Sequence, residues 1–293
     1  MQRREAIAVI AAGVSSPFLT GTARFRGKHP PTPDFATIER QIAGRLGVAA
    51  LDVATRRRLT YRATERFPMC STFKWLLAAQ VLSLTDAGRE QLSRVIPYSQ
   101  LDLLDYAPVT RAHVSEGGMT LSGLSAAAIQ HSDNTAANLL LRVVGGPSSL
   151  TAFLRQLGDT VTRLDRTEPD LNSAVPGDVR DTTTPNAMIT DMEALLIGNH
   201  LTRASRALLL DWLTGNTTGG DKLRAGLPEG WRIGDKTGSG AHGTTNDVAI
   251  VWPSPQRPVL VAAYLTETTA AVPASNQALA AVGRAVAAWV GDA

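Results

Sequence analysis

The longest helical pattern in the chain reads Ser71-Thr-Phe-Lys-Trp-Leu-Leu-Ala-Ala-Gln-Val-Leu-Ser-Leu84 and continues to Ala87. Apolar residues recur at helical spacing, and Gly88 follows where helices commonly end. Lys74 comes three residues after Ser71, which places both side chains on one face of a helix, one turn apart. We therefore predict a helix over 71–87 that begins with a serine and a lysine side by side.

Strands and helices are distributed unevenly around this helix. A helical segment, 34–46, and two short strands, 48–53 and 58–62, precede it. After it come helical segments at 120–130, 135–144, 191–198 and 205–213, then strand-like segments at 231–237, 247–252 and 259–266, then an Ala-rich helix at 276–290. Because strands lie at both ends of the chain, we predict an α/β (α+β) fold. It has a five-stranded antiparallel sheet flanked by N- and C-terminal helices, with an all-helical domain inserted.

The predicted domain boundaries follow these changes in pattern. Residues 1–27 are an export signal and linker, 28–62 and 216–293 form the discontinuous sheet domain, and 63–215 form the helical domain. The segment 164–181 within the helical domain is polar, rich in proline and without periodicity. A loop of this length in a compact enzyme is usually functional.

Composition excludes several classes of function. The chain has 293 residues, 44% of them hydrophobic, and a net charge of +3, which is ordinary for a soluble globular protein. Its basic residues form no run interleaved with aromatic residues, so we expect no nucleic-acid partner. The single cysteine, Cys70, excludes an intramolecular disulfide, and the five histidines are far apart in sequence. We therefore expect no metal and no cofactor.

The N-terminus is typical of an export signal. A basic start, Met1-Gln-Arg-Arg-Glu, is followed by the apolar stretch 6–14 and small residues up to Ala23. The pair Arg3-Arg4 indicates the twin-arginine route, and the alternative is a disordered tail in which the arginines occur by chance. The apolar stretch is too short to span a bilayer, so we expect a mature chain that is not inserted in the membrane.

The pair Ser71 and Lys74 could supply a nucleophile and its base. A serine hydroxyl becomes a good nucleophile when a nearby base removes its proton. At the start of a helix, free backbone N–H groups could also stabilise a developing oxyanion. Taken alone, this motif is weak, because the same spacing occurs at the start of many surface helices.

Two further motifs carry groups suited to the same chemistry. In Ser132-Asp-Asn134, the hydroxyl could pass on a proton and the amide could orient a substrate, although for this motif taken alone a helix N-cap is the favoured explanation. In Lys236-Thr-Gly238, the lysine could bind a carboxylate and the glycine would admit a substrate close to a strand. Ser239 follows with a backbone N–H that could be a second oxyanion donor.

The fourth motif, Glu168-Pro-Asp-Leu-Asn172, lies in the long polar loop. A carboxylate beside an amide can hold and activate one water molecule, although a solvated acidic loop would look similar. The four motifs follow one another at intervals of roughly 60, 35 and 70 residues, and their order is far more specific than any one of them.

With these motifs, the sequence resembles the class A serine β-lactamases over residues 33–290. The family implies a two-domain fold with its active site in the cleft between the domains. The resemblance also implies that Ser71 attacks the lactam carbonyl, that Ser132 relays a proton to the ring nitrogen, and that Glu168 activates the deacylating water. Either Lys74 or Glu168 could be the base in acylation. The resemblance assigns substrate binding to Tyr106, Asn134, Asn172, Lys236, Thr237 and Ser239, and it matches Arg166 and Asp181 to the pair that joins the ends of the loop.

Two departures bear on substrate preference. Where many members have an arginine after the Lys-Thr-Gly strand, this chain has Thr245, so we expect Lys222 to supply that charge unless it is an exposed loop lysine. Some carbapenem-hydrolysing members join the cysteine before the nucleophile to a second cysteine beyond the Lys-Thr-Gly motif, but here Gly240 occupies the apparent position of that partner of Cys70.

The implied activity is hydrolysis of penicillins and cephalosporins by a monomer that is periplasmic or secreted, conferring β-lactam resistance. The alternatives are a penicillin-binding peptidase, which would lack the Glu168 loop, and a non-enzymatic β-lactam sensor.

Overall fold

The computed structural model describes residues 34–291, which belong to one unit, Thr32–Ala293. The predicted export signal and linker, 1–27, lies outside the described residues. Within the described part, no helix is long and apolar enough to cross a membrane.

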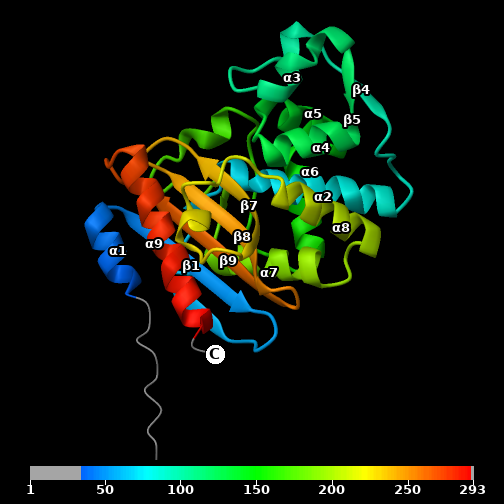
Figure 1. Cartoon of the computed structure of the whole chain (residues 1–293). Coiled ribbons are helices and arrows are strands. Elements are labelled where there is room, and N and C mark those ends of the chain that lie inside the picture. Colours follow the sequence, from blue (N-terminus) through cyan, green and yellow to red (C-terminus); the bar gives the residue numbers. More distant parts are fainter. Residues whose placement is uncertain (1–33, 292–293) are drawn as a thin grey trace, which may run out of the picture. The chain divides into compact units, whose positions relative to one another are not determined.

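The centre of the fold is a five-stranded antiparallel sheet in the order β2-β1-β9-β8-β7 (Figure 1). Its strands are β1 (Arg45–Asp52), β2 (Arg58–Tyr61), β7 (Arg232–Ser239), β8 (Thr245–Ser254) and β9 (Arg257–Thr266). Strand β9 lies between β1 and β8, so the two ends of the chain build one sheet. The predicted fold class is confirmed. The further division into a sheet domain and a helical domain stays a prediction, although all five strands fall within 28–62 and 216–293.

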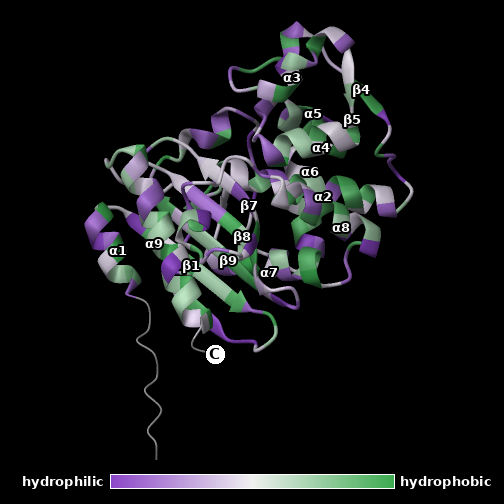
Figure 2. Ribbon diagram, in the orientation of Figure 1, coloured by the Kyte–Doolittle hydropathy of each residue, from purple (hydrophilic) through white to green (hydrophobic). Residues whose placement is uncertain are grey.

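The sheet is buried on both faces, as the alternation along β9 shows. Leu260, Ala262 and Tyr264 belong to a core shared with the central helices. The residues between them belong to a second core beneath α1 (Phe35–Ile42) and α9 (Val272–Gly291). Strand residues point alternately to opposite faces, so this pattern requires a layer on each side. Figure 2 shows hydrophobic and hydrophilic residues alternating along both terminal helices, as expected for helices with one buried face.

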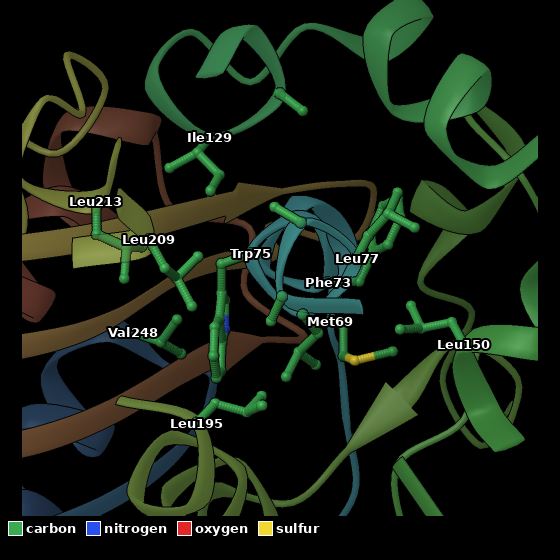
Figure 3. Close-up of a cluster of buried hydrophobic side chains, with 14 of the residues drawn as sticks. Met69, Phe73, Trp75, Leu77, Ile129, Leu150, Leu195, Leu209, Leu213 and Val248 are labelled. Atoms are coloured by element: carbon green, nitrogen blue, oxygen red, sulfur yellow. The ribbon is translucent and has the colours of Figure 1, made fainter. Parts of the chain in front are cut away.

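Helix α2 (Phe73–Asp86) is the centre of the helical part. Every residue from Phe73 to Leu82 is buried, and Figure 3 shows Trp75 of this helix pointing toward Val248 and Leu195. It is contacted by α4 (Leu121–Gln130), α5 (Asn134–Val144), α6 (Pro147–Gln156) and α8 (Arg203–Thr214). Helix α3 (Pro108–Ala112) packs on α4, and α7 (Pro185–Met192) packs on strands β1 and β9. Two short strand pairs complete the structure: β3 (Phe67–Pro68) with β6 (Thr182–Thr183), and β4 (Val95–Pro97) with β5 (Gly118–Thr120).

Several predicted helices have different bounds. The helix predicted over 276–290 is longer and spans Val272–Gly291. The helix predicted over 34–46 ends at Ile42, because the chain turns there to pair as β1. The C-cap residue Ala43 has a left-handed backbone with φ +47°, and a Cβ at Gly44 would lie 2.9 Å from the Thr268 Cβ, so the chain passes this point through a glycine. The helix predicted over 71–87 begins at Phe73, after a 3-10 turn at Cys70–Thr72. The segment 191–198 joins the end of α7 to a π-helical turn at Glu193–Ile197.

Candidate active site

Ser71 lies in the 3-10 turn that leads into α2, with its backbone at the start of a buried helix. The residue before it, Cys70, has a left-handed backbone with φ +46°, an uncommon conformation for a residue other than glycine. The turn is closed by the Met69 carbonyl, which accepts hydrogen bonds from the Thr72 N–H at 3.2 Å and from its hydroxyl at 2.9 Å. The serine is therefore presented by a tightly fixed stretch of backbone.

Lys74 is the centre of a buried polar group. Its Nζ lies 2.9 Å from Glu168 Oε1 and donates to the Ser132 carbonyl at 2.7 Å and to Asn134 Oδ1 at 2.6 Å. The Ser71 hydroxyl donates to the same Glu168 oxygen at 3.3 Å. The Lys74 and Glu168 side chains are both inaccessible to solvent. Four motifs that are far apart in sequence thus meet at one point, three of them directly through these bonds.

The fourth motif joins this group through Ser132. Lys236 Nζ donates to the Ser132 hydroxyl at 3.0 Å and to the Thr237 carbonyl at 2.7 Å. Lys74 Nζ lies 3.5 Å from the same hydroxyl. A hydroxyl between two amines can accept a proton on one side and release it on the other.

The two amines lose affinity for protons in this environment. Burial lowers the pKa of Lys74, and the charge of Glu168 opposes this shift. Burial lowers the pKa of Lys236 well below its usual range, and the nearby charge of Lys74 lowers it further. Buried amines with a depressed pKa can exchange protons near neutral pH, as acid–base catalysis requires.

Glu168 is held from both sides. Asn172 Nδ2 donates to its second carboxylate oxygen. Asn138 binds its backbone, donating to the Glu168 carbonyl at 2.8 Å and accepting from the Glu168 N–H at 3.0 Å. The sequence interpretation missed Asn138. Asn138 follows Asn134 by one turn of α5 and so lies on the same face, but the sequence does not show that this face meets the loop of Glu168.

The loop that carries Glu168 is joined at its two ends by the expected pair. Arg166 Nε lies 2.6 Å from Asp181 Oδ2. The other Asp181 oxygen accepts the backbone N–H groups of Asp165 at 2.7 Å and of Arg166 at 2.9 Å. Arg166 also donates to the Ser173 hydroxyl at 2.9 Å. One buried carboxylate therefore fixes both ends of the loop.

A cleft of about 350 Å³ opens above this group. It is lined by Ser71, Tyr106, Ser132, Asn134, Asn172, Thr218, Lys222, Thr237, Gly238 and Ser239. Lys74, Glu168 and Lys236 lie beneath its floor, and Tyr106, which is 53% exposed, stands at its edge. Thr218 was not expected, and its hydroxyl lies 2.6 Å from the Thr237 hydroxyl.

Two residues that the sequence analysis linked to substrate preference also have defined positions. Lys222 is only 8% exposed, so the alternative of an exposed loop lysine is wrong. Burial and the charge of Asp235 raise the pKa of the buried Asp247, and the charge of Lys222 opposes this shift. A Cβ at Gly240 would lie 2.6 Å from Cys70 Sγ, so these two residues do face each other. Burial raises the pKa of the Cys70 thiol, which makes it a packed side chain rather than a reactive one.

The chemistry available in this cleft is acyl transfer. A serine at a helix start, with a carboxylate and a depressed-pKa amine beneath it, can attack a carbonyl and pass its proton to neighbouring groups. The fold and the site therefore define a serine hydrolase.

Comparison with known proteins gives the family. A sequence model described as the β-lactamase enzyme family matches residues 31–290, and the chain belongs to this family, as a class A serine β-lactamase.

Relatives and solved structures agree with this assignment. The chain is 47% identical to a β-lactamase of Citrobacter koseri over 273 residues, which cover 93% of this chain and 92% of that protein. It is 48% identical to β-lactamase CTX-M-8 of Citrobacter amalonaticus over 251 residues, or 86% of each chain. An ancestral class A β-lactamase superimposes with a TM-score of 0.85 at 58% identity, covering 87% of this chain and 98% of the other. A putative class A β-lactamase from Rhodopseudomonas palustris gives a TM-score of 0.84 at 53% identity, covering 86% and 97%.

Proposed function

We propose that this enzyme hydrolyses the β-lactam amide of penicillins and cephalosporins through an acyl-enzyme on Ser71, which is released by a water molecule that Glu168 activates. The observation that carries the proposal is the contact of the Glu168 carboxylate with both the Ser71 hydroxyl and the Lys74 amine. A penicillin-binding peptidase would be acylated at the same serine, but it would lack this carboxylate.

In the proposed acylation step, Ser71 Oγ attacks the lactam carbonyl, and the backbone N–H groups of Ser71 and Ser239 stabilise the oxyanion. The existing hydrogen bond favours Glu168 as the first acceptor of the serine proton. Within residues 34–291, no hydrogen bond joins Lys74 to Ser71, so Lys74 acts through Glu168 and Ser132. Glu168 returns the proton through Lys74 to Ser132, whose hydroxyl delivers a proton to the ring nitrogen as the C–N bond breaks.

In the proposed deacylation step, Glu168 removes a proton from a water molecule that attacks the ester carbonyl. Asn172 holds the carboxylate from the side of the cleft, and its own buried Oδ1 has no hydrogen-bond partner in the described part of the chain. This free acceptor suits a bound water molecule. The bond between the acyl carbon and Ser71 Oγ breaks, and the serine oxygen takes back a proton from Glu168.

The substrate carboxylate has several partners on the opposite wall of the cleft. Thr237 and Ser239 would donate hydroxyl hydrogen bonds, and Lys236 and Lys222 would supply positive charge. Asn134 and Tyr106 would contact the amide side chain of the substrate at the other end of the cleft.

A turnover assay tests the function. Purified protein should hydrolyse a chromogenic cephalosporin steadily over many turnovers, and Ser71→Ala should abolish hydrolysis. One burst per enzyme molecule followed by no further reaction would instead identify a penicillin-binding peptidase or a sensor.

We further propose that residues 1–23 direct export, which would make the enzyme a periplasmic or secreted monomer that confers β-lactam resistance. This proposal rests on the sequence of the N-terminus. Sequencing the N-terminus of the mature protein tests the cleavage, and changing Arg3-Arg4 to Lys-Lys tests the twin-arginine route. Size-exclusion chromatography with light scattering tests the monomer.

A further inference from the structure

Asn246 lies behind the catalytic turn, fully buried in strand β8. It pairs in the sheet with Gly238 of β7 on one side and with Tyr264 of β9 on the other. The cleft is not lined by Asn246, and no motif in the sequence pointed to it.

The Asn246 amide leaves the sheet to bind the backbone just before the nucleophile. Its Nδ2 donates to the Pro68 carbonyl at 2.9 Å and to the Met69 carbonyl at 3.1 Å. Its Oδ1 is buried without a hydrogen-bond donor in the part of the chain that the structure describes. A buried acceptor without a donor is unfavourable, so the contribution of this side chain lies in its NH2 group.

Gly238 leaves the space that this contact needs. A Cβ at Gly238 would lie 2.7 Å from the Met69 carbonyl oxygen and 3.2 Å from Asn246 Nδ2. The strand that carries Ser239 and the turn that carries Ser71 therefore approach each other through this glycine, and the Asn246 amide joins them there.

Contacts hold the Met69 carbonyl, its N–H group and its side chain. Its carbonyl accepts from Asn246 and Thr72, its N–H donates to the Asp181 carbonyl at 2.9 Å, and its side chain lies in the central core (Figure 3). The next residue, Cys70, holds a left-handed backbone that persists only where surrounding contacts enforce it.

We propose that Asn246 is a positioning residue for the oxyanion site, holding the Ser71 N–H in register with the Ser239 N–H. This inference rests on the proposed function, in which these two N–H groups bind the developing oxyanion. Because the two donors come from segments 168 residues apart, a specific tie between them determines how well both point at one oxygen.

The test replaces Asn246 with leucine, which has a similar volume and no NH2 group. A phenylboronic acid forms a tetrahedral adduct with the serine and places one oxygen in the oxyanion site. Its affinity and the acylation rate should fall by about ten- to a hundredfold, as for a small misplacement of catalytic groups. The dissociation constant of the initial noncovalent complex with a cephalosporin, from stopped-flow kinetics, should change less than about twofold.

Gln80→Met is the matched control. Gln80 is a buried amide of α2 that donates to the Ser149 carbonyl at 3.2 Å and to the Ser149 hydroxyl at 3.0 Å, away from the cleft. Its replacement also removes two hydrogen bonds from a buried amide. It should lower the melting temperature and leave boronate affinity unchanged.

A second variant keeps the test decisive if Asn246→Leu does not fold. Asn246→Asp retains the shape, and when protonated it can still donate one hydrogen bond. Its deficit in boronate affinity relative to the wild type should therefore be larger at pH 8 than at pH 5.

Boronate affinity and acylation that stay at wild-type levels, or that fall no more than in Gln80→Met, would overturn the inference. A wild-type enzyme that fails to turn over a cephalosporin would refute the proposed function and this inference together, whereas an active wild type with unaffected Asn246 variants would refute this inference alone.

Discussion

Replacing Glu168 with glutamine should separate acylation from deacylation. Glu168 Oε1 now accepts from Ser71 at 3.3 Å and lies 2.9 Å from Lys74, while its other oxygen accepts from Asn172. A glutamine that keeps its oxygen toward Asn172 would turn its NH2 group toward Ser71 and Lys74, so the site would lose its carboxylate base without losing its shape.

The two steps should respond unequally to this change. Burial already lowers the pKa of Lys74, and the charge of Glu168 opposes that shift, so neutralising Glu168 makes the neutral amine more abundant. Because Glu168 is the first acceptor in the wild type, acylation slows, but neutral Lys74, one turn along the helix, can still take the serine proton. Deacylation has no substitute base near the water, and loss of a general base costs a factor of about 10² to 10⁴. This corresponds to about 3–5 kcal/mol of activation free energy, since each factor of ten is about 1.4 kcal/mol.

The assay combines stopped-flow kinetics with intact-protein mass spectrometry. The variant should release one equivalent of chromophore in a burst, then turn over at least a hundredfold more slowly than the wild type. Its mass should increase by that of the bound acyl group, on a peptide that contains Ser71. Turnover within tenfold of the wild type, or a silent variant that carries no adduct, would refute the reasoning.

Three further predictions test specificity, pH dependence and packing. Lys222→Met removes a charge from the wall of the cleft. In steady-state kinetics it should raise KM for penicillins about tenfold, with a much smaller change in kcat. An unchanged KM would show that the substrate carboxylate binds elsewhere. Burial and the charge of Asp159 raise the pKa of Asp191 well above its usual range. Above a pH of about 4, the folded protein therefore keeps a proton on Asp191 that the unfolded chain has released. The free energy of unfolding consequently falls as the pH rises from about 4 toward that raised pKa. Asp191→Asn should flatten this dependence and increase the free energy of unfolding at pH 8 more than at pH 5 in urea titrations, and a slope equal to that of the wild type would contradict the assignment. Leu76 is fully buried in α2, so Leu76→Ala should cost about 2–5 kcal/mol, seen as a lower melting temperature, and a loss below about 1 kcal/mol would indicate loose packing.

Most of the fold follows from local patterns in the sequence. The strands of the last third and the helix at 71–87 were predicted within a few residues, because apolar periodicity and turn residues mark them directly. The N-terminal helix was predicted too long because its periodicity continues into β1. What ends it is pairing with β9, which lies more than 200 residues away in the sequence. No local pattern carries that information.

The residues of the candidate site also fall into two groups: those that local motifs identify and those that depend on contacts between distant segments. Ser71, Lys74, Ser132 and Lys236 belong to motifs whose spacing and order identify them, and the structure brings them together. Asn138 and Asn246 act on backbone atoms of distant segments. Such contacts depend on where two parts of the chain meet, and a single sequence gives only the residue type.

The position of β9 between β1 and β8 has a consequence for biosynthesis. Strand β9 leaves the ribosome more than 200 residues after β1 but lies between β1 and β8, so β1 and β8 have no common neighbour until β9 has been synthesised. Pairings over such separations form slowly, because a long loop must close before any contact compensates its entropy. A polypeptide that stops before Val259 would present two unmatched strand edges, and we expect it to aggregate or be degraded instead of persisting as a partly active fragment.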